Sequence, residues 1–231
     1  VDEYDYVICT AGDCANFPMG IKYFACLGAL ANYSLPFDDR RQGFLMGDGG
    51  ACMILQSEEK MKEFGSKSYA KLYQCGMASD AVDMVNPEGT GTRASMINAL
   101  HNYGTGAVDY VCTHGTSTVA GDPIEYEAVS EVLPGTKMWA PKSKIGHTLA
   151  ASGILEGCYA IESMRNGVVP HIQNLKECSL DVHGTLVREN EEFTMHNRKR
   201  SMLNNSFGFG GKCMSQVIEV ELEQHERANP E

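Results

Sequence analysis

The 231-residue sequence contains no C-x-x-C pair, although it has nine cysteines. Zinc ribbons and thioredoxin-type redox sites use such pairs, so neither kind of site is expected. The cysteines are odd in number and most lie in apolar runs such as Val7-Ile8-Cys9, which indicates buried reduced thiols rather than a disulfide framework. This pattern favours an intracellular compartment, and we expect a cytoplasmic protein.

Positive charge is also scarce, because 19 Lys and Arg stand against 30 Asp and Glu, giving a formal net charge of −11. Broad binding to nucleic acid needs an excess of basic residues to neutralise phosphates, so no nucleic-acid partner is expected. There is no apolar run of about 18 residues, which a membrane-spanning helix would need. The acidic start, Val1 to Asp5, lacks the basic and apolar regions of a signal peptide.

What is present is an alternation of short apolar strands with helical stretches, which predicts an α/β protein whose sheet is covered on both faces. The helix predicted at 18–32 is apolar around most of its circumference, so we expect it to be buried on more than one side. Asp122 is the predicted N-cap of the helix at 123–132. The tail at 224–231 is polar. The other helices are predicted at 57–65, 93–103 and 149–164, and the strands at 6–10, 50–56, 69–77, 108–111, 138–140, 201–205 and 216–222.

Three segments each place glycines and small residues around polar side chains directly after a predicted strand. The first runs from Cys112 to Thr118 and on to Gly121-Asp122, the second from Lys142 to Thr148, and the third from Asn204 to Gly211. In open α/β sheets, ligands bind beyond the carboxyl ends of the strands, where these segments would lie.

Taken singly, each segment has a structural explanation that stays open: a hydrogen-bonded loop histidine, a solvated lysine, or phenylalanines that fill the core beside a glycine turn. Other functional motifs do not fit. The Gly211-Lys212-Cys213 segment lacks the spacing of a phosphate-binding P-loop, and no serine lies in a G-x-S-x-G elbow. The histidines also lack the close helical spacing of a hydrolytic zinc site, so no metal is expected.

Taken together, the segments resemble the condensing enzymes of the thiolase fold, and within them the β-ketoacyl-(acyl-carrier-protein) synthases of fatty-acid and polyketide assembly. The resemblance covers nearly the whole chain. It is carried by four matching segments: Pro36-Phe37-Asp38 with Arg41, Gly43-Phe44 and Gly47-Asp48-Gly49; His114-Gly115-Thr116-Ser117-Thr118 with Gly121-Asp122; Lys142 with Gly146-His147; and Asn205-Ser206-Phe207-Gly208-Phe209-Gly210-Gly211. It implies a layered α-β-α-β-α fold, with residues 1–80 as the end of the first half, 81–223 as the second half and 224–231 as a tail.

The resemblance also implies roles for individual residues. His114 and His147 would donate N–H groups to a developing enolate, Lys142 would support the first histidine, and Glu156 would tie into that lysine. Phe209 would be the aromatic gate between the acyl and malonyl pockets. The substrate-binding residues would be Thr116, Thr118, Phe207, Gly208 and Phe24. No cofactor is expected beyond the phosphopantetheine of an acyl carrier protein, which brings the substrate.

One departure from the family pattern is large. The family's nucleophilic cysteine lies upstream of the part this chain resembles, and none of the nine cysteines here has its context. Two interpretations stay open: a natural split enzyme whose partner supplies the first half in a homo- or hetero-oligomer, or a truncated or partial sequence. Two other functions also stay open, a non-catalytic subunit similar to chain-length factors and a thiolase-like acyltransferase. The paired histidines favour a ketosynthase over the chain-length-factor-like subunit. Lys142 with Gly146-His147 favours a ketosynthase over the thiolase-like acyltransferase.

Overall fold

The computed structural model describes residues 4–80, 82, 88–192 and 199–221. Its largest sheet has six strands in the order β3-β10-β9-β5-β6, with β4 also paired to β10. Strand β5 is parallel to both β6 and β9, whereas β10 is antiparallel to its neighbours. The strands are β3 (Lys71–Leu72), β4 (Gly76–Ser79), β5 (Tyr110–Cys112), β6 (Lys137–Trp139), β9 (Lys199–Gly208) and β10 (Lys212–Glu221).

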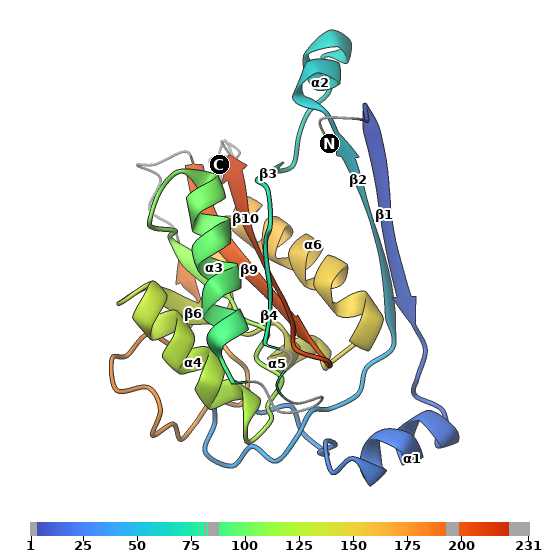
Figure 1. Ribbon diagram of the computed structural model, residues 1–231, viewed down its shortest axis with the longest axis vertical. Helices are drawn as coiled ribbons and strands as arrows, with labels where there is room; N and C mark the ends of the chain where they lie inside the picture. Colours follow the sequence, from blue (N-terminus) through green and yellow to red (C-terminus); the bar gives the residue numbers. More distant parts are fainter. Residues whose placement is uncertain (1–3, 81, 83–87, 193–198, 222–231) are drawn as a thin grey trace, which may run out of the picture.

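The elements are stacked in four layers (Figure 1). Helices α3 (Thr90–Tyr103) and α4 (Gly121–Val132) cover one face of the six-stranded sheet, and α6 (Ser152–Arg165) covers the other. Beyond α6 lies an antiparallel ribbon of β1 (Tyr6–Asp13) and β2 (Gly49–Gln56). The core between the sheet and its helices is apolar. It contains side chains such as Val111, Met138 and Leu203, which are all fully buried. The layers α-β-α-β match four of the five that the resemblance implied.

The remaining elements are short. They are α1 (Pro18–Cys26), α2 (Glu58–Phe64), α5 (Lys142–Ile145), a 3₁₀ turn (Leu149–Ala151), β7 (Val168–Val169) and β8 (Glu191–Glu192). Helix α2 begins and ends as predicted: the Ser57 hydroxyl accepts the N–H of Lys60 at 3.3 Å, and Gly65 takes the left-handed conformation at φ 61°. None of the helices in the described part of the chain has an apolar stretch long enough to cross a lipid bilayer.

The single strand predicted at 69–77 is wrong in detail, because the structure divides it into β3 and β4. Leu72 pairs with Ile218, and Gly76 pairs with Ser215. Three residues, 73–75, therefore face two residues, 216–217, of β10. The extra residue forms a bulge, and a bulge interrupts the hydrogen-bond ladder.

The burial predicted for the first helix is also wrong. Helix α1 ends at Cys26 rather than near residue 32, and none of its residues is buried. Met19 and Tyr23 are 70% and 63% exposed. The apolar composition was identified correctly, but the described residues offer no layer for this helix to pack against.

Asp122 is not the N-cap of α4. The helix begins after Ala120, and the Thr118 hydroxyl accepts the N–H of Gly121 at 3.1 Å. The Asp122 carboxylate instead accepts the N–H of Phe37, at 2.7 Å. The helix predicted from residue 149 begins as the 3₁₀ turn, and the two closing strands, β9 and β10, are longer than predicted. The polar tail lies outside the described residues.

Candidate active site

The three segments singled out in the sequence leave the same edge of the six-stranded sheet. His114 follows β5, Lys142 and His147 follow β6, and Phe207 lies near the end of β9. Since β5, β6 and β9 are parallel, their carboxyl ends lie together, and the prediction that these segments gather there is confirmed.

Glu125 anchors the loop that carries the first histidine. Its two carboxylate oxygens accept the backbone N–H groups of His114 and Gly115, each at 2.8 Å. The Asn205 amide on β9 donates to the same carboxylate at 3.1 Å. Glu125 is 3% exposed, and burial raises its pKa against the effect of these donors. The first and third segments are thus joined through one buried acid.

The sequence analysis did not identify Glu125, although a signal was available. Its neighbours one helical turn away on α4 are Gly121, Asp122, Ala128 and Val129, so no basic side chain stands at ion-pair spacing. Acids on a helix face with no basic partner and with small or apolar residues beside them indicate buried carboxyl groups with partners from elsewhere in the fold.

The segment before β2 braces the same loop from the other side. The Arg41 guanidinium donates to the carbonyl oxygen of Thr118 at 3.2 Å, and the Leu35 N–H donates to the Ser117 hydroxyl at 2.9 Å. With the bond from Phe37 to Asp122, these contacts explain why the segment around Pro36 to Arg41 stands out in the sequence: it holds the loop of His114 from outside the sheet.

Lys142 and Glu156 form a buried ion pair behind the first histidine. Lys142 Nζ lies 2.6 Å from Glu156 Oε1, with the two side chains 1% and 0% exposed. The same ammonium lies 3.2 Å from His114 Nδ1. Burial raises the pKa of Glu156, and the charge of Lys142 opposes that rise. The geometry thus brings Lys142, Glu156 and His114 together in the contacts that the resemblance implied.

The second histidine is held by a strained turn. Gly146 has φ 71° and ψ −172°, and a Cβ at this position would lie 3.0 Å from the carbonyl oxygen of Leu45. Leu149 is left-handed at φ 50°, which is unfavourable for a leucine, and its N–H donates to His147 Nδ1 at 3.2 Å. The Ser152 hydroxyl lies 3.0 Å from the same nitrogen.

Both imidazoles have their Nδ1 atoms turned into the protein. An ammonium has donors and no acceptor, so His114 Nδ1 accepts from Lys142, and His147 Nδ1 accepts from the Leu149 N–H. A neutral ring that accepts at Nδ1 carries its proton at Nε2. Each ring therefore offers one Nε2–H donor on the side away from its anchor.

The rings themselves are adjacent and part of an aromatic row. The centroids of His114 and His147 are 5.5 Å apart with the planes at 89°, and Phe207 lies 5.6 Å from His114. Phe44 lies 5.1 Å from His147 and 5.6 Å from Phe24 of α1. The structure thus places Phe24 and Phe207 at opposite ends of the row. Phe44 is a further member, which the sequence analysis placed in a matching segment without giving it a role.

Both histidines are neutral at physiological pH. Burial, the Lys142 ammonium and the neighbouring His147 hold the pKa of His114 well below its usual range. Burial and Lys142 lower the pKa of His147 to about 3. The site therefore presents neutral N–H donors, which can stabilise a developing negative charge without first losing a proton.

Acid should destabilise the fold through His147. The unfolded imidazole titrates near 6.5 and the folded one near 3, so the unfolded state takes up the proton first. Stability should be constant above about pH 6.5 and fall below it, by up to about 1.4 kcal/mol per pH unit for this group. Urea unfolding at a series of pH values, with His147→Gln for comparison, measures the slope. Equal slopes in both proteins would contradict the assignment.

The other predicted site residues lie in the loop after His114 and around the end of β9. The hydroxyls of Thr116 and Thr118 lie 3.1 Å from each other in the loop after His114. Gly208 ends β9 and is exposed, and Phe209 is 51% exposed in the turn between β9 and β10. No contact of Phe209 with either histidine is seen within the described residues, so its role as a gate stays a prediction.

Cys112 is the cysteine nearest to His114 in the sequence, but it is not an available nucleophile. It is 1% exposed, and burial together with the charge of Glu156 raises the pKa of its thiol well above the usual range. Attack requires the thiolate, which this environment disfavours. Among residues 4–80, 82, 88–192 and 199–221, no cluster of three or more His, Cys, Asp and Glu side chains could hold a metal ion.

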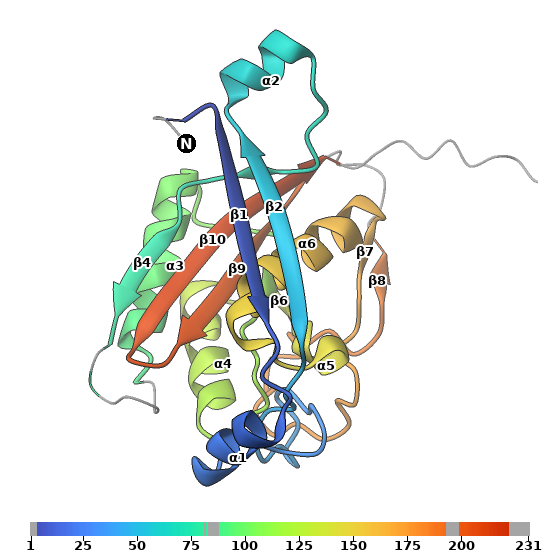
Figure 2. The same ribbon diagram turned by 90° about the vertical axis from the view of Figure 1, so that its right-hand side faces the viewer.

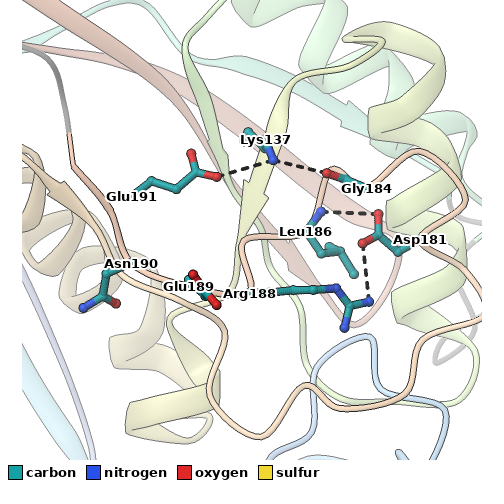
Figure 3. A pocket seen from close by; sticks show the side chains of 8 residues that line it. All are labelled: Lys137, Asp181, Gly184, Leu186, Arg188, Glu189, Asn190 and Glu191. Atoms are coloured by element: carbon teal, nitrogen blue, oxygen red, sulfur yellow. Dashed lines mark hydrogen bonds and ion pairs between the residues drawn. The ribbon is translucent and has the colours of Figure 1, made fainter.

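A separate pocket of about 320 Å³ lies away from the histidines, around the start of β6 and the segment before β8 (Figure 3). Four of its five charged side chains form ion pairs with one another. Lys137 lies 3.4 Å from Glu191 and donates to the Gly184 carbonyl at 3.2 Å, and Arg188 lies 3.5 Å from Asp181. This pocket therefore has structural ion pairs and is not a second reactive centre.

Comparison with known proteins agrees with this geometry. The family described as "Beta-ketoacyl synthase, C-terminal domain" matches residues 69–176, the part that carries β3 to β7 with both histidines. This part of the chain belongs to the β-ketoacyl synthase family. A curated relative from Coxiella burnetii, 3-oxoacyl-[acyl-carrier-protein] synthase 2, is 33% identical over 229 residues, which are 91% of this chain and 54% of the relative.

Solved ketosynthase structures share the fold. The ishigamide ketosynthase/chain length factor superposes with a TM-score of 0.86 at 27% identity, over 96% of this chain and 55% of that one. A type II polyketide ketosynthase in complex with its acyl-carrier protein gives 0.85 at 25% identity, over 94% and 56%. The fold is thus the thiolase-like one. The chain spans about half the length of the β-ketoacyl synthases it matches.

Proposed function

We propose that the chain supplies the two histidines of a ketosynthase, which condenses an acyl thioester with malonyl-carrier protein in fatty-acid or polyketide synthesis. The observation that carries the proposal is the pair of neutral imidazoles, 5.5 Å apart, whose Nδ1 atoms are both occupied by the protein. Two Nε2–H donors are left for a substrate. The enzyme class would be an acyltransferase, incomplete without its nucleophile.

The proposed reaction requires hydrogen-bond donors in this arrangement. In decarboxylation the bond between the malonyl methylene carbon and its carboxylate breaks, and carbon dioxide leaves. The electron pair passes to the thioester as an enolate, which then attacks the acyl group. His114 and His147 would donate to the enolate oxygen, and the buried Lys142–Glu156 pair would hold His114 in the donating tautomer.

We infer that the nucleophilic thiolate comes from outside these 231 residues, either from the same polypeptide or from a paired subunit. Support comes from the buried Cys112 and from the apolar surface of the ribbon. Among the described residues, strands β1 and β2 pair only with each other (Figure 2). Their burial alternates along each strand, and Ile8 and Ile54 on the outer face are 68% and 67% exposed. An apolar patch of this kind marks an interaction site.

The division of the fold follows from the same idea. Residues 1–80 would complete a first half whose remainder packs on the ribbon and on α1, and residues 81–223 would form the second half. Helix α1 fits this assignment, because its apolar side chains are exposed in the chain by itself while Phe24 reaches the aromatic row of the site.

A charged side chain on the outer face of the β1–β2 ribbon, the face turned away from α6, should block this assembly. Ile8 and Ile54 are direct partners across the two strands, so Ile8→Asp places a carboxylate in the centre of the proposed interface. We expect the affinity for the separately produced first half to fall by at least about tenfold, because the charge would be buried without a partner. Titration calorimetry measures it. Val182→Asp, at a 74% exposed position elsewhere, is the matched control, and equal affinities for both variants would contradict the proposed interface.

The remaining expectations belong to this proposal. The substrate would arrive on the phosphopantetheine of an acyl carrier protein, with no further cofactor, and Thr116 and Thr118 would bind that arm. The assembly would be homo- or hetero-oligomeric and cytoplasmic. The solved relative in complex with its acyl-carrier protein supports the carrier, and the ketosynthase/chain length factor supports a paired subunit.

A second candidate function is a non-catalytic subunit similar to a chain length factor, favoured by the likeness to the ketosynthase/chain length factor structure. The test that separates the two is release of carbon dioxide from malonyl-carrier protein by the assembled protein. Release that depends on the histidines of this chain supports the enzyme. Release that survives their removal would assign the chemistry to the partner.

A further inference from the structure

Ser152 occupies a position that neither the family resemblance nor the sequence motifs single out. It is the first residue of α6 and is 4% exposed. Its hydroxyl oxygen lies 3.0 Å from His147 Nδ1, accepts the Thr148 N–H at 3.1 Å, and lies 3.2 Å from the Thr148 hydroxyl. A buried hydroxyl therefore touches the anchored nitrogen of the second imidazole.

Ser152 also precedes Glu156 by one turn of α6, and its hydroxyl lowers the pKa of that carboxyl against the effect of burial. Glu156 pairs with Lys142, and Lys142 reaches His114 Nδ1. The groups that stand behind the two imidazoles thus lie one turn apart on α6.

We infer that Ser152 is a positioning residue for His147; the inference rests on the proposed ketosynthase function. Without the hydroxyl, His147 Nδ1 keeps only the 3.2 Å contact from Leu149, whose left-handed backbone is itself unfavourable. The ring would then be free to turn, or to carry its proton on Nδ1. In either case a donor to the substrate would be lost for part of the time.

The experiment compares Ser152→Ala with wild type in the complete, assembled protein. We expect kcat for decarboxylation of malonyl-carrier protein to fall about tenfold with KM unchanged, because a buried hydrogen bond that orients the donor is lost. Nitrogen-15 NMR of the histidine rings should show His147 with an unprotonated Nδ1 in wild type and a second, Nδ1-protonated population in the variant. Ser152→Thr, which keeps the hydroxyl, should restore both.

Ser201→Ala is the matched control, since Ser201 is also a buried serine and its hydroxyl is hydrogen-bonded, to Asp109, near the opposite end of β9. Its kcat should be unchanged. Should Ser152→Ala fail to fold, Ser152→Cys keeps the volume and weakens the hydrogen bond. A folded variant with unchanged kcat and ring tautomer overturns the inference, and so does a loss that Ser152→Thr does not recover. Wild type with the expected tautomer but no release of carbon dioxide would contradict the proposed function and leave the role of Ser152 standing.

Discussion

His147→Ala should lower the release of carbon dioxide from malonyl-carrier protein by about a hundred- to a thousandfold, the usual cost of removing one preorganised donor. The same loss is expected for His114→Ala. Both rings are neutral donors anchored at Nδ1, so each contributes one preoriented N–H, and each packs edge-on against a phenylalanine, Phe44 for His147 and Phe207 for His114. The measurement is the rate of carbon dioxide release by the assembled protein.

The control for this prediction is His183→Ala, which removes an exposed histidine in a surface turn. Its rate should equal that of wild type. Assembly of all three variants should be intact, because neither ring lies on the outer face of the ribbon. Unchanged release in either His114→Ala or His147→Ala would remove the role assigned to that residue.

Lys142→Met should lower the free energy of unfolding by about 3–5 kcal/mol, since it leaves Glu156 unpaired at a position that is 0% exposed. The double variant Lys142→Met with Glu156→Leu should regain most of that stability, because a buried ion pair can be replaced by apolar side chains at little cost. Urea unfolding of the two variants and wild type measures the differences.

The single and double variants should differ in stability but not in activity. The double variant should remain as slow in decarboxylation as the single one, because His114 Nδ1 would have lost its donor in both. A double variant that is both stable and active would show that the ion pair contributes packing alone. The matched control is Lys62→Met, which breaks an exposed pair with Glu58 on α2 and should change neither property appreciably.

The arrangement explains why the site residues are spread over the chain. Each imidazole is held from behind by a different kind of partner, a buried ammonium for His114 and a strained backbone amide for His147. The open side is lined by aromatic rings, among them Phe24 from the part of the chain proposed to complete the first half of the fold. The histidines are thus oriented by this chain, whereas the nucleophile, as proposed, is added by the part that covers the ribbon.

Local features were predictable from the sequence alone. Ser57 and Gly65 marked the ends of α2 because capping depends on neighbouring backbone groups, and alternating strands and helices predicted the covered sheet. The three segments after β5, β6 and at the end of β9 were identified as one site because parallel strands end at the same edge of a sheet. The residue types His, Lys and Glu in their order along the chain already pointed to the chemistry.

The contacts across the fold were decided by tertiary structure. Glu125 reaches the loop of His114 only because α4 packs on β9, and the left-handed Leu149 takes its conformation from the turn between Gly146 and α6. The exposure of α1 could not be inferred from its apolar composition, since burial depends on whether another layer is present. Helix caps and strand alternation are set by neighbours within a few residues, whereas the anchoring of each imidazole and the covering of each face depend on groups that only folding brings together.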